Sequence, residues 1–166
     1  MKNAALLCTA CAGLLAAQWR HFGDGSSGTP SSMADEMIGA HNRLRAQVGA
    51  PPLRWSRDLA SYAQDWANRL AREDRLYHHP HPVYGENLFL MDGGRVRPAN
   101  VVASWAAERG NYDYRTNSCR GRCGHYTQIV WRDTQQVGCA RAESGNTQVW
   151  VCEYSPPGNI VGDRPY

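Results

Sequence analysis

Lysine is almost absent from this chain of 166 residues: Lys2 is the only one, and arginine supplies the other 17 basic side chains. The formal net charge is only +3, and no stretch gathers basic residues into a stripe, which argues against a nucleic-acid-binding protein. The HExxH, GxSxG and P-loop motifs are also missing, and no GxGxxG opens a helix, which excludes the hydrolase and nucleotide-binding classes that depend on them. With 42% apolar and 20% charged residues, the composition is that of a folded domain.

One apolar run stands out, at the N-terminus. Lys2 precedes small and apolar residues at 4–17, a run too short to span a bilayer but typical of a signal peptide. We therefore predict a signal peptide and flexible lead-in over residues 1–25, one domain over residues 33–166, and export to the extracellular space, or to the periplasm of a bacterium. The alternatives are a lipoprotein anchored at Cys11 and an uncleaved apolar N-terminus of a cytosolic protein.

Hydrophobic periodicity in the mature chain places helices first and strands last. Ser32 followed by Asp35 resembles a capping box at the start of the first helix, and Gly49 ends it. We expect helices at residues 33–48, 57–74 and 98–109, and strands at residues 88–91, 126–131, 137–144 and 147–154. Without a regular βαβ alternation, this order predicts an α+β layered domain.

The last two strands predict a disulfide. Gly145-Asn146 is a two-residue hairpin turn that sets Ser144 opposite Thr147. Counting outward brings Cys139 opposite Cys152 at a non-hydrogen-bonded pair, where the Cα atoms lie about 4.5 Å apart, a separation that a disulfide tolerates.

Two further cysteines remain in the mature chain, Cys119 and Cys123, in a loop of glycine and arginine. They could close a small ring of their own. The alternative is a zinc site made of all four cysteines, but the paired CxxC spacing of such sites is missing.

The candidate functional residues are acids and histidines from separate segments. Glu108 follows Val101 and Trp105 on the apolar face of the third expected helix, and His125 shares a side of the expected strand with Thr127 and Ile129. Taken singly, each has a structural explanation: a glutamate at a frayed helix end, or a histidine at a core edge. Glu86, in YGENL, and a loop with His78, His79 and His81 complete the set. If they converge, two imidazoles and two carboxylates could hold zinc.

At these residues the sequence resembles the CAP superfamily, which is named for cysteine-rich secretory proteins, antigen 5 and pathogenesis-related class 1 proteins. GHYTQIVWRDT at 124–134 and VWVCEYSPPGNI at 149–160 match two family signatures, with a departure at Glu153, where the family has Asn, Gln, Arg, His or Ser. AHNRLRAQVGAPPLRW, YGENL and SWAAERGNYDY follow the remaining family blocks in order, so the resemblance covers about residues 36–160. Asp74 stands where the plant pattern has a cysteine.

The resemblance implies a three-layer α-β-α sandwich with a central, mostly antiparallel sheet. It also implies a cleft tetrad and the disulfides Cys119–Cys123 and Cys139–Cys152. The tetrad consists of His78, Glu86, Glu108 and His125, with His79 as the alternative to His78. His78 and His125 would be the metal ligands, whereas His41 would be structural.

The function implied by the resemblance is that of a secreted binding protein linked to defence or secretion. Its cleft would hold a divalent metal, zinc, and an apolar groove would take a lipid or sterol. We expect a monomer without a membrane span, and we assign no catalytic residue. The alternatives are a metal-dependent hydrolase or protease, which would use a glutamate to activate a zinc-bound water, and a structural or signalling module.

Overall fold

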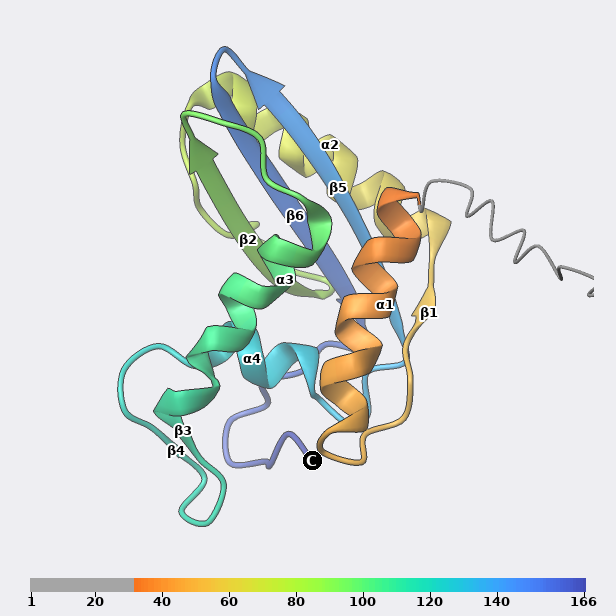
Figure 1. Ribbon diagram of the computed structural model, residues 1–166, viewed down its shortest axis with the longest axis vertical. Helices are drawn as coiled ribbons and strands as arrows, with labels where there is room; N and C mark the ends of the chain where they lie inside the picture. Colours follow the sequence, from red (N-terminus) through yellow and green to blue (C-terminus); the bar gives the residue numbers. More distant parts are fainter. Residues whose placement is uncertain (1–31) are drawn as a thin grey trace, which may run out of the picture.

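A computed structural model describes residues 32–166 and shows a four-stranded sheet between layers of helices (Figure 1). The predicted signal peptide over residues 1–25 lies outside the described residues. The helices are α1 (Met33–Ala46), α2 (Arg57–Glu73), α3 (Pro98–Ala106), the 3-10 helix η1 (Ala107–Asn111) and α4 (Gly124–Ile129). The strands are β1 (Arg54–Trp55), β2 (Gly85–Asp92), β3 (Tyr112–Asp113), β4 (Ser118–Cys119), β5 (Gln136–Ser144) and β6 (Thr147–Ser155).

The main sheet has the strand order β1-β5-β6-β2. β5 and β6 form the predicted hairpin, in which Ser144 pairs with Thr147 and Cys139 pairs with Cys152. A disulfide joins Cys139 to Cys152, with 4.1 Å between the Cα atoms, which confirms the predicted register. β2 and β6 are antiparallel, whereas the short β1 is parallel to β5. β2 is therefore an edge strand of this sheet.

Helices cover both faces of the sheet, which confirms the α-β-α sandwich. α2 packs on one face through residues such as Trp66 and Leu70, against Val151 of β6. α1, α3 and α4 share the other core with Trp150 of β6 (Figure 1). Gly138 of β5 allows α2 to come close, because a Cβ atom there would collide with the helix backbone at residues 59–60.

The strand predicted at residues 126–131 is absent from the structure. These residues form most of α4 and the turn after it, so the expected strand is wrong. Residues 126–129 are all buried, so no polar face reveals the helical period, and a short buried helix then has the same apolar pattern as a buried strand. His125 consequently lies in the first turn of a helix and does not share a sheet face with Thr127 and Ile129.

The helix ends follow the local signals more closely. Ser32 and Asp35 form the predicted capping box, with the Asp35 amide donating to the Ser32 hydroxyl at 3.1 Å. Asp74 caps the C-terminal end of α2 and adopts the left-handed conformation with a φ of 48°. The third helix tightens into η1 after Ala106, so Glu108 lies in a 3-10 turn.

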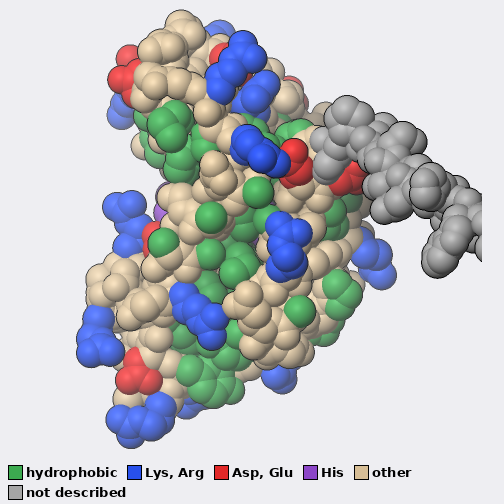
Figure 2. All heavy atoms as spheres, viewed as in Figure 1, with side chains coloured by type: hydrophobic (Ala, Val, Ile, Leu, Met, Phe, Trp, Pro, Cys, Tyr) green, Lys and Arg blue, Asp and Glu red, His purple; other side chains and the backbone are tan. Residues whose placement is uncertain are grey.

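The surface carries its positive charge in scattered positions. On the face drawn in Figure 2, arginine side chains are dispersed between apolar and neutral side chains and form no continuous stripe. None of the helices within residues 32–166 combines the length and the apolar character that crossing a bilayer requires.

Candidate functional site

A cleft of about 640 Å³ opens along β2. Its walls come from β2, from α3 and η1, from the start of α4, and from the loop that precedes β2. All four residues of the expected tetrad line it: His78, Glu86, Glu108 and His125. The fold thus brings to one cleft four side chains that come from four separate segments of the chain.

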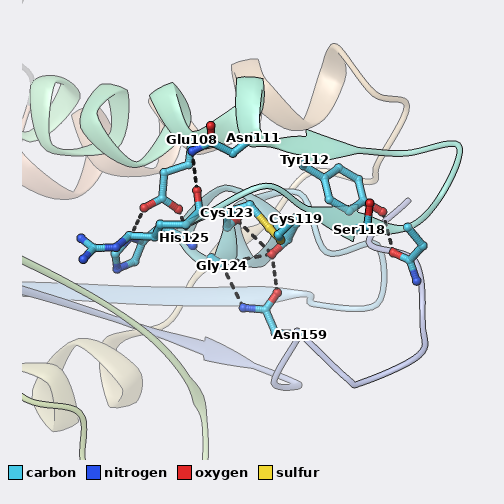
Figure 3. Close-up of a disulfide and its surroundings, with 12 residues drawn as sticks. Glu108, Asn111, Tyr112, Ser118, Cys119, Cys123, Gly124, His125 and Asn159 are labelled. Carbon is cyan, nitrogen blue, oxygen red and sulfur yellow. Dashed lines mark hydrogen bonds and ion pairs between the residues drawn. A yellow bond between two sulfur atoms is a disulfide. The ribbon is translucent and has the colours of Figure 1, made fainter.

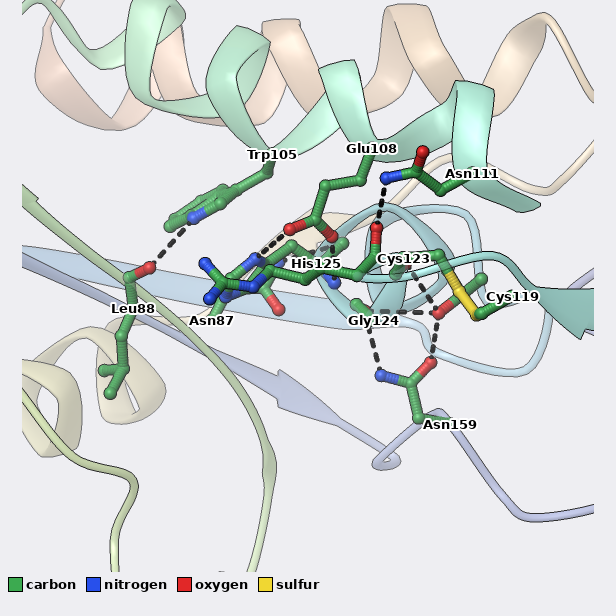
Figure 4. Close-up of polar contacts among 12 residues, drawn as sticks. Asn87, Leu88, Trp105, Glu108, Asn111, Cys119, Cys123, Gly124, His125 and Asn159 are labelled. Atoms are coloured by element: carbon green, nitrogen blue, oxygen red, sulfur yellow. Dashed lines mark hydrogen bonds and ion pairs between the residues drawn. A yellow bond between two sulfur atoms is a disulfide. The ribbon is translucent and has the colours of Figure 1, made fainter.

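His125 and Glu108 form the first of two histidine–carboxylate pairs (Figure 4). The His125 Nδ1 atom lies 2.8 Å from Oε1 of Glu108, and the His125 backbone amide donates to Oε2 at 2.9 Å. Both carboxylate oxygens therefore contact the same residue. Because one contact is made by the backbone, the carboxylate fixes both the position of the start of α4 and the orientation of the imidazole.

His125 is also held by one residue of α3 and one residue of β2. The Trp105 indole stacks on the His125 ring with 6.0 Å between ring centroids, and the indole N–H donates to the Leu88 carbonyl at 3.0 Å (Figure 4). The Asn87 side-chain amide donates to the His125 carbonyl at 3.1 Å. α3 and β2 therefore hold α4 in place from two directions.

A disulfide and an asparagine anchor the beginning of α4 (Figure 3). Cys119 of β4 is bonded to Cys123, the residue before the helix, as the family resemblance implies. The Asn159 amide donates to the Gly124 carbonyl at 2.9 Å, and its oxygen accepts from the Thr127 hydroxyl at 2.6 Å. Asn159 was not among the predicted site residues, although it lies in the second family signature.

His78 and Glu86 form the second pair. The His78 Nδ1 atom lies 2.5 Å from Oε1 of Glu86. The glutamate side chain is 4% exposed and the imidazole 64% exposed, so a buried carboxylate holds a ring that faces solvent. The hydrogen bond to Glu86 raises the pKa of His78, and this effect outweighs the opposing effect of burial.

The neighbouring histidines are placed differently. His79 contacts Glu86 only through its backbone amide, at 3.2 Å, while its ring packs against Trp66 and Tyr62 of α2 at centroid distances of 4.6 and 5.6 Å. His81 is exposed on the loop. Of the three loop histidines, it is thus His78 whose imidazole meets the carboxylate and lines the cleft.

Glu153 is a further acid beside this pair. It lies directly opposite Glu86 in the β2–β6 register and is 2% exposed. Burial and the neighbouring Glu86 raise the pKa of Glu153 to about 9. Local sequence patterns could not show this proximity, because it arises from the pairing of two strands that are distant in the chain.

The donor set suits a zinc ion bound by two imidazoles. In both pairs Nδ1 faces a carboxylate, and neither Nε2 atom has a hydrogen-bond partner within residues 32–166. A carboxylate on Nδ1 is the common means of presenting Nε2 to a metal. The described part of the chain contains no group of three or more His, Cys, Asp or Glu side chains that could hold a metal ion, so zinc binding by His78 and His125 stays a prediction.

Comparisons with known proteins agree with the fold and the motifs. Residues 38–154 match the model of the CAP family, described as the cysteine-rich secretory protein family. Pathogenesis-related protein 1 of Arabidopsis thaliana is 43% identical over 132 residues, which cover 79% of this chain and 81% of the relative. The structure of Schistosoma mansoni venom allergen-like protein 4 superposes with a TM-score of 0.64 at 27% identity, over 82% of this chain and 94% of that one. The crystal structure of NaASP2 with Zn²⁺ superposes with a TM-score of 0.66 at 24% identity, over 82% and 86% of the two chains.

Proposed function

This chain belongs to the cysteine-rich secretory protein family, and we propose that it is an exported binding protein whose cleft holds a zinc ion through His78 and His125. One observation carries the proposal: each imidazole has its Nδ1 atom on a carboxylate and its Nε2 atom without a partner in the described chain. The Zn²⁺ in the NaASP2 structure, a protein of the same fold, supports the choice of metal.

The carboxylates favour binding over hydrolysis. A hydrolase of this type needs a carboxylate oxygen that takes a proton from a metal-bound water. Both oxygens of Glu108 are engaged by His125. Oε1 of Glu86 accepts from His78 and His79, and its Oε2 atom is buried away from solvent. Both groups therefore orient imidazoles, which is a role in binding.

We expect the zinc affinity to depend on pH. Zinc binds the neutral imidazole, so protons compete with the metal once the pH approaches the histidine pKa, which is about 6.5 without perturbation. Because Glu86 raises the pKa of His78, this competition begins at a higher pH than for a free histidine. Isothermal titration calorimetry with zinc chloride should show weaker binding at pH 5.5 than at pH 7.5.

The same titration on variants tests the ligands. His125→Ala removes one imidazole and should weaken zinc binding by about tenfold or more, judging by the losses that follow changes around metal ligands. His81→Ala is the matched control, since His81 is an exposed histidine of the same loop as His78, and its affinity should equal that of the wild type. Equal affinity of the wild type and His125→Ala would remove the metal from the proposal and leave a hydrogen-bonded structural tetrad.

Three parts of the wider functional prediction stay predictions. They are the lipid- or sterol-binding groove, the monomeric state, and secretion directed by residues 1–25. The names of the relatives place the family in pathogenesis-related biology, and we extend that setting to this chain as part of the proposal.

A further inference from the structure

Two glutamates face each other across β2 and β6. Glu86 and Glu153 are directly paired in the register, and both are almost fully removed from solvent, with 4% of the Glu86 side chain and 2% of Glu153 exposed. Side chains of directly paired residues lie on the same face of a sheet, with their Cβ atoms about 5 Å apart. After burial, the neighbouring Glu86 is the cause that raises the pKa of Glu153, through its charge and through a side-chain hydrogen bond.

Each carboxyl group has an oxygen that receives no hydrogen bond from the described chain. These atoms are Oε2 of Glu86 and Oε1 of Glu153. The other Glu86 oxygen is engaged by the His78 ring and the His79 amide.

The groups packed around the two acids supply no positive charge to Glu153. The titratable groups that interact with the two acids are the Tyr62 phenol from α2, the Tyr154 phenol from β6 and the His78 imidazole from the histidine loop. The His79 backbone amide also donates to Glu86, and Gly138 of β5, which pairs with Glu153, has no side chain. Within residues 32–166, no guanidinium forms an ion pair with Glu86 or Glu153. An ionised Glu153 would therefore place two negative charges side by side with one imidazole for compensation.

A proton on Glu153 would remove the repulsion between the two carboxylates and would also give the two unpartnered oxygens a hydrogen bond. Two adjacent carboxyl groups in a site of low dielectric do not ionise together, and the proton that remains is shared in a short, strong hydrogen bond. An O–H group on Glu153 that donates to Glu86 would also satisfy the orphaned oxygens, each of which otherwise costs the desolvation of a buried polar atom. The raised pKa of Glu153 agrees with this arrangement.

We propose that Glu153 is a positioning residue of the cleft, which as a neutral carboxylic acid donates a hydrogen bond to Glu86 and so holds the Glu86 carboxylate against His78. Glu153 departs from the residues usual at this position of the family signature, so the device belongs to this chain's own sequence. Its effect on zinc affinity rests on the proposed function, whereas the hydrogen bond itself is a property of the metal-free protein.

The protonation of Glu153 is tested by unfolding the metal-free protein in urea between about pH 4.5 and 9. A native carboxyl group that keeps its proton binds more protons than the unfolded chain over this range, so wild-type stability falls as the pH rises. Glu153→Gln keeps the shape and an N–H donor but has no proton to lose. Its stability advantage over the wild type should therefore grow with pH. Glu143→Gln, at an exposed glutamate of β5, should show no such trend. If the difference in the free energy of unfolding between Glu153→Gln and the wild type did not change with pH, the proposal would be overturned.

The positioning role is tested by comparing Glu153→Gln with Glu153→Leu, which cannot donate. In the metal-free protein, ¹⁵N shifts of His78 should show the Nδ1–H tautomer in the wild type and in Glu153→Gln, and a change in Glu153→Leu. With zinc alone as the probe, affinity should stay within about twofold for Glu153→Gln and fall by about tenfold or more for Glu153→Leu. A wild-type His78 spectrum in Glu153→Leu would overturn the positioning role. If the wild type binds no zinc but the ¹⁵N difference is present, the proposed function fails and this inference stands.

Discussion

Arg45→Met should destabilise the protein by about 4 kcal/mol or more, at the upper end of single-residue effects, because it removes the donors of a buried network. Arg45 is fully buried in α1. Its guanidinium donates to the Pro51 carbonyl and to four carbonyls at the end of α4 and just after it. No carboxylate pairs with it within residues 32–166; burial lowers its pKa to about 10, so it is still protonated at neutral pH. The four residues whose carbonyls accept there are Ile129, which ends α4, and Trp131, Arg132 and Thr134.

Arg45→Lys keeps the charge but replaces five planar donors with three on a compact ammonium group. It should therefore lose less stability than Arg45→Met, about 2 kcal/mol on the scale of one or two buried hydrogen bonds to a charged group, and it keeps the test open if the methionine variant does not fold. Arg43→Met, at an exposed arginine of the same helix, should change stability by no more than about 0.5 kcal/mol. Urea unfolding at neutral pH measures all three, and a loss below 1 kcal/mol in Arg45→Met would contradict the predicted role.

Local patterns predicted the elements whose determinants lie within a few residues of one another. The capping box at Ser32, the helix predicted over residues 57–74 and the hairpin with Cys139 opposite Cys152 follow from spacing alone, and the structure confirms them, with the helix ending one residue earlier. α4 was predicted as a strand because its buried residues show no helical period. In such a segment, the length of the element and its burial on all sides decide between a helix and a strand, and they become known only from the packed fold.

The site was predictable as a set of residues but not as a geometry. Glu108 and His125 were selected from an apolar helix face and a family motif, and they do form a pair. The contacts that hold the pair, such as Asn87 with the His125 carbonyl, join strands and helices far apart in the chain. The role of Arg45 could not be predicted from the sequence either. An arginine is almost never fully buried unless its donors are satisfied, and all but one of the carbonyls that accept from Arg45 lie more than eighty residues away in sequence.

His41 should make the protein lose stability as the pH falls from about 6.5 to about 4, by roughly 3 kcal/mol in total. This imidazole is fully buried in α1, and burial is the main cause that lowers its pKa to about 4. The unfolded chain therefore binds a proton that the native protein excludes throughout this window. The free energy of unfolding falls as the pH is lowered through it, and above about pH 6.5 the full stability is present.

The hydrogen bonds around His41 explain why its neutral form is favoured. Nδ1 lies 2.8 Å from the Met37 carbonyl, which can only accept, so Nδ1 carries the hydrogen. Nε2 lies 2.8 Å from the Tyr154 hydroxyl, whose oxygen already accepts from the Asn87 amide at 3.1 Å. The Tyr154 hydrogen is therefore donated to Nε2. A proton on Nε2 would displace this donor and leave a buried hydroxyl hydrogen without an acceptor, which adds to the cost of burying the charge.

His41→Gln isolates this contribution, because an amide can donate to Met37 and accept from Tyr154 but does not titrate. Urea unfolding at intervals between pH 7.5 and 4 gives the free energy of unfolding of the wild type and of His41→Gln. The difference between the two should change by roughly 3 kcal/mol as the pH falls, because only the wild type loses the contribution of His41. The comparison is best made in the Glu153→Gln background, since the raised pKa of Glu153 makes stability change in the opposite direction over part of this range. A constant difference between the two curves would show that His41 titrates normally in the native protein, and the network from Met37 to Asn87 would then lack the proton arrangement described.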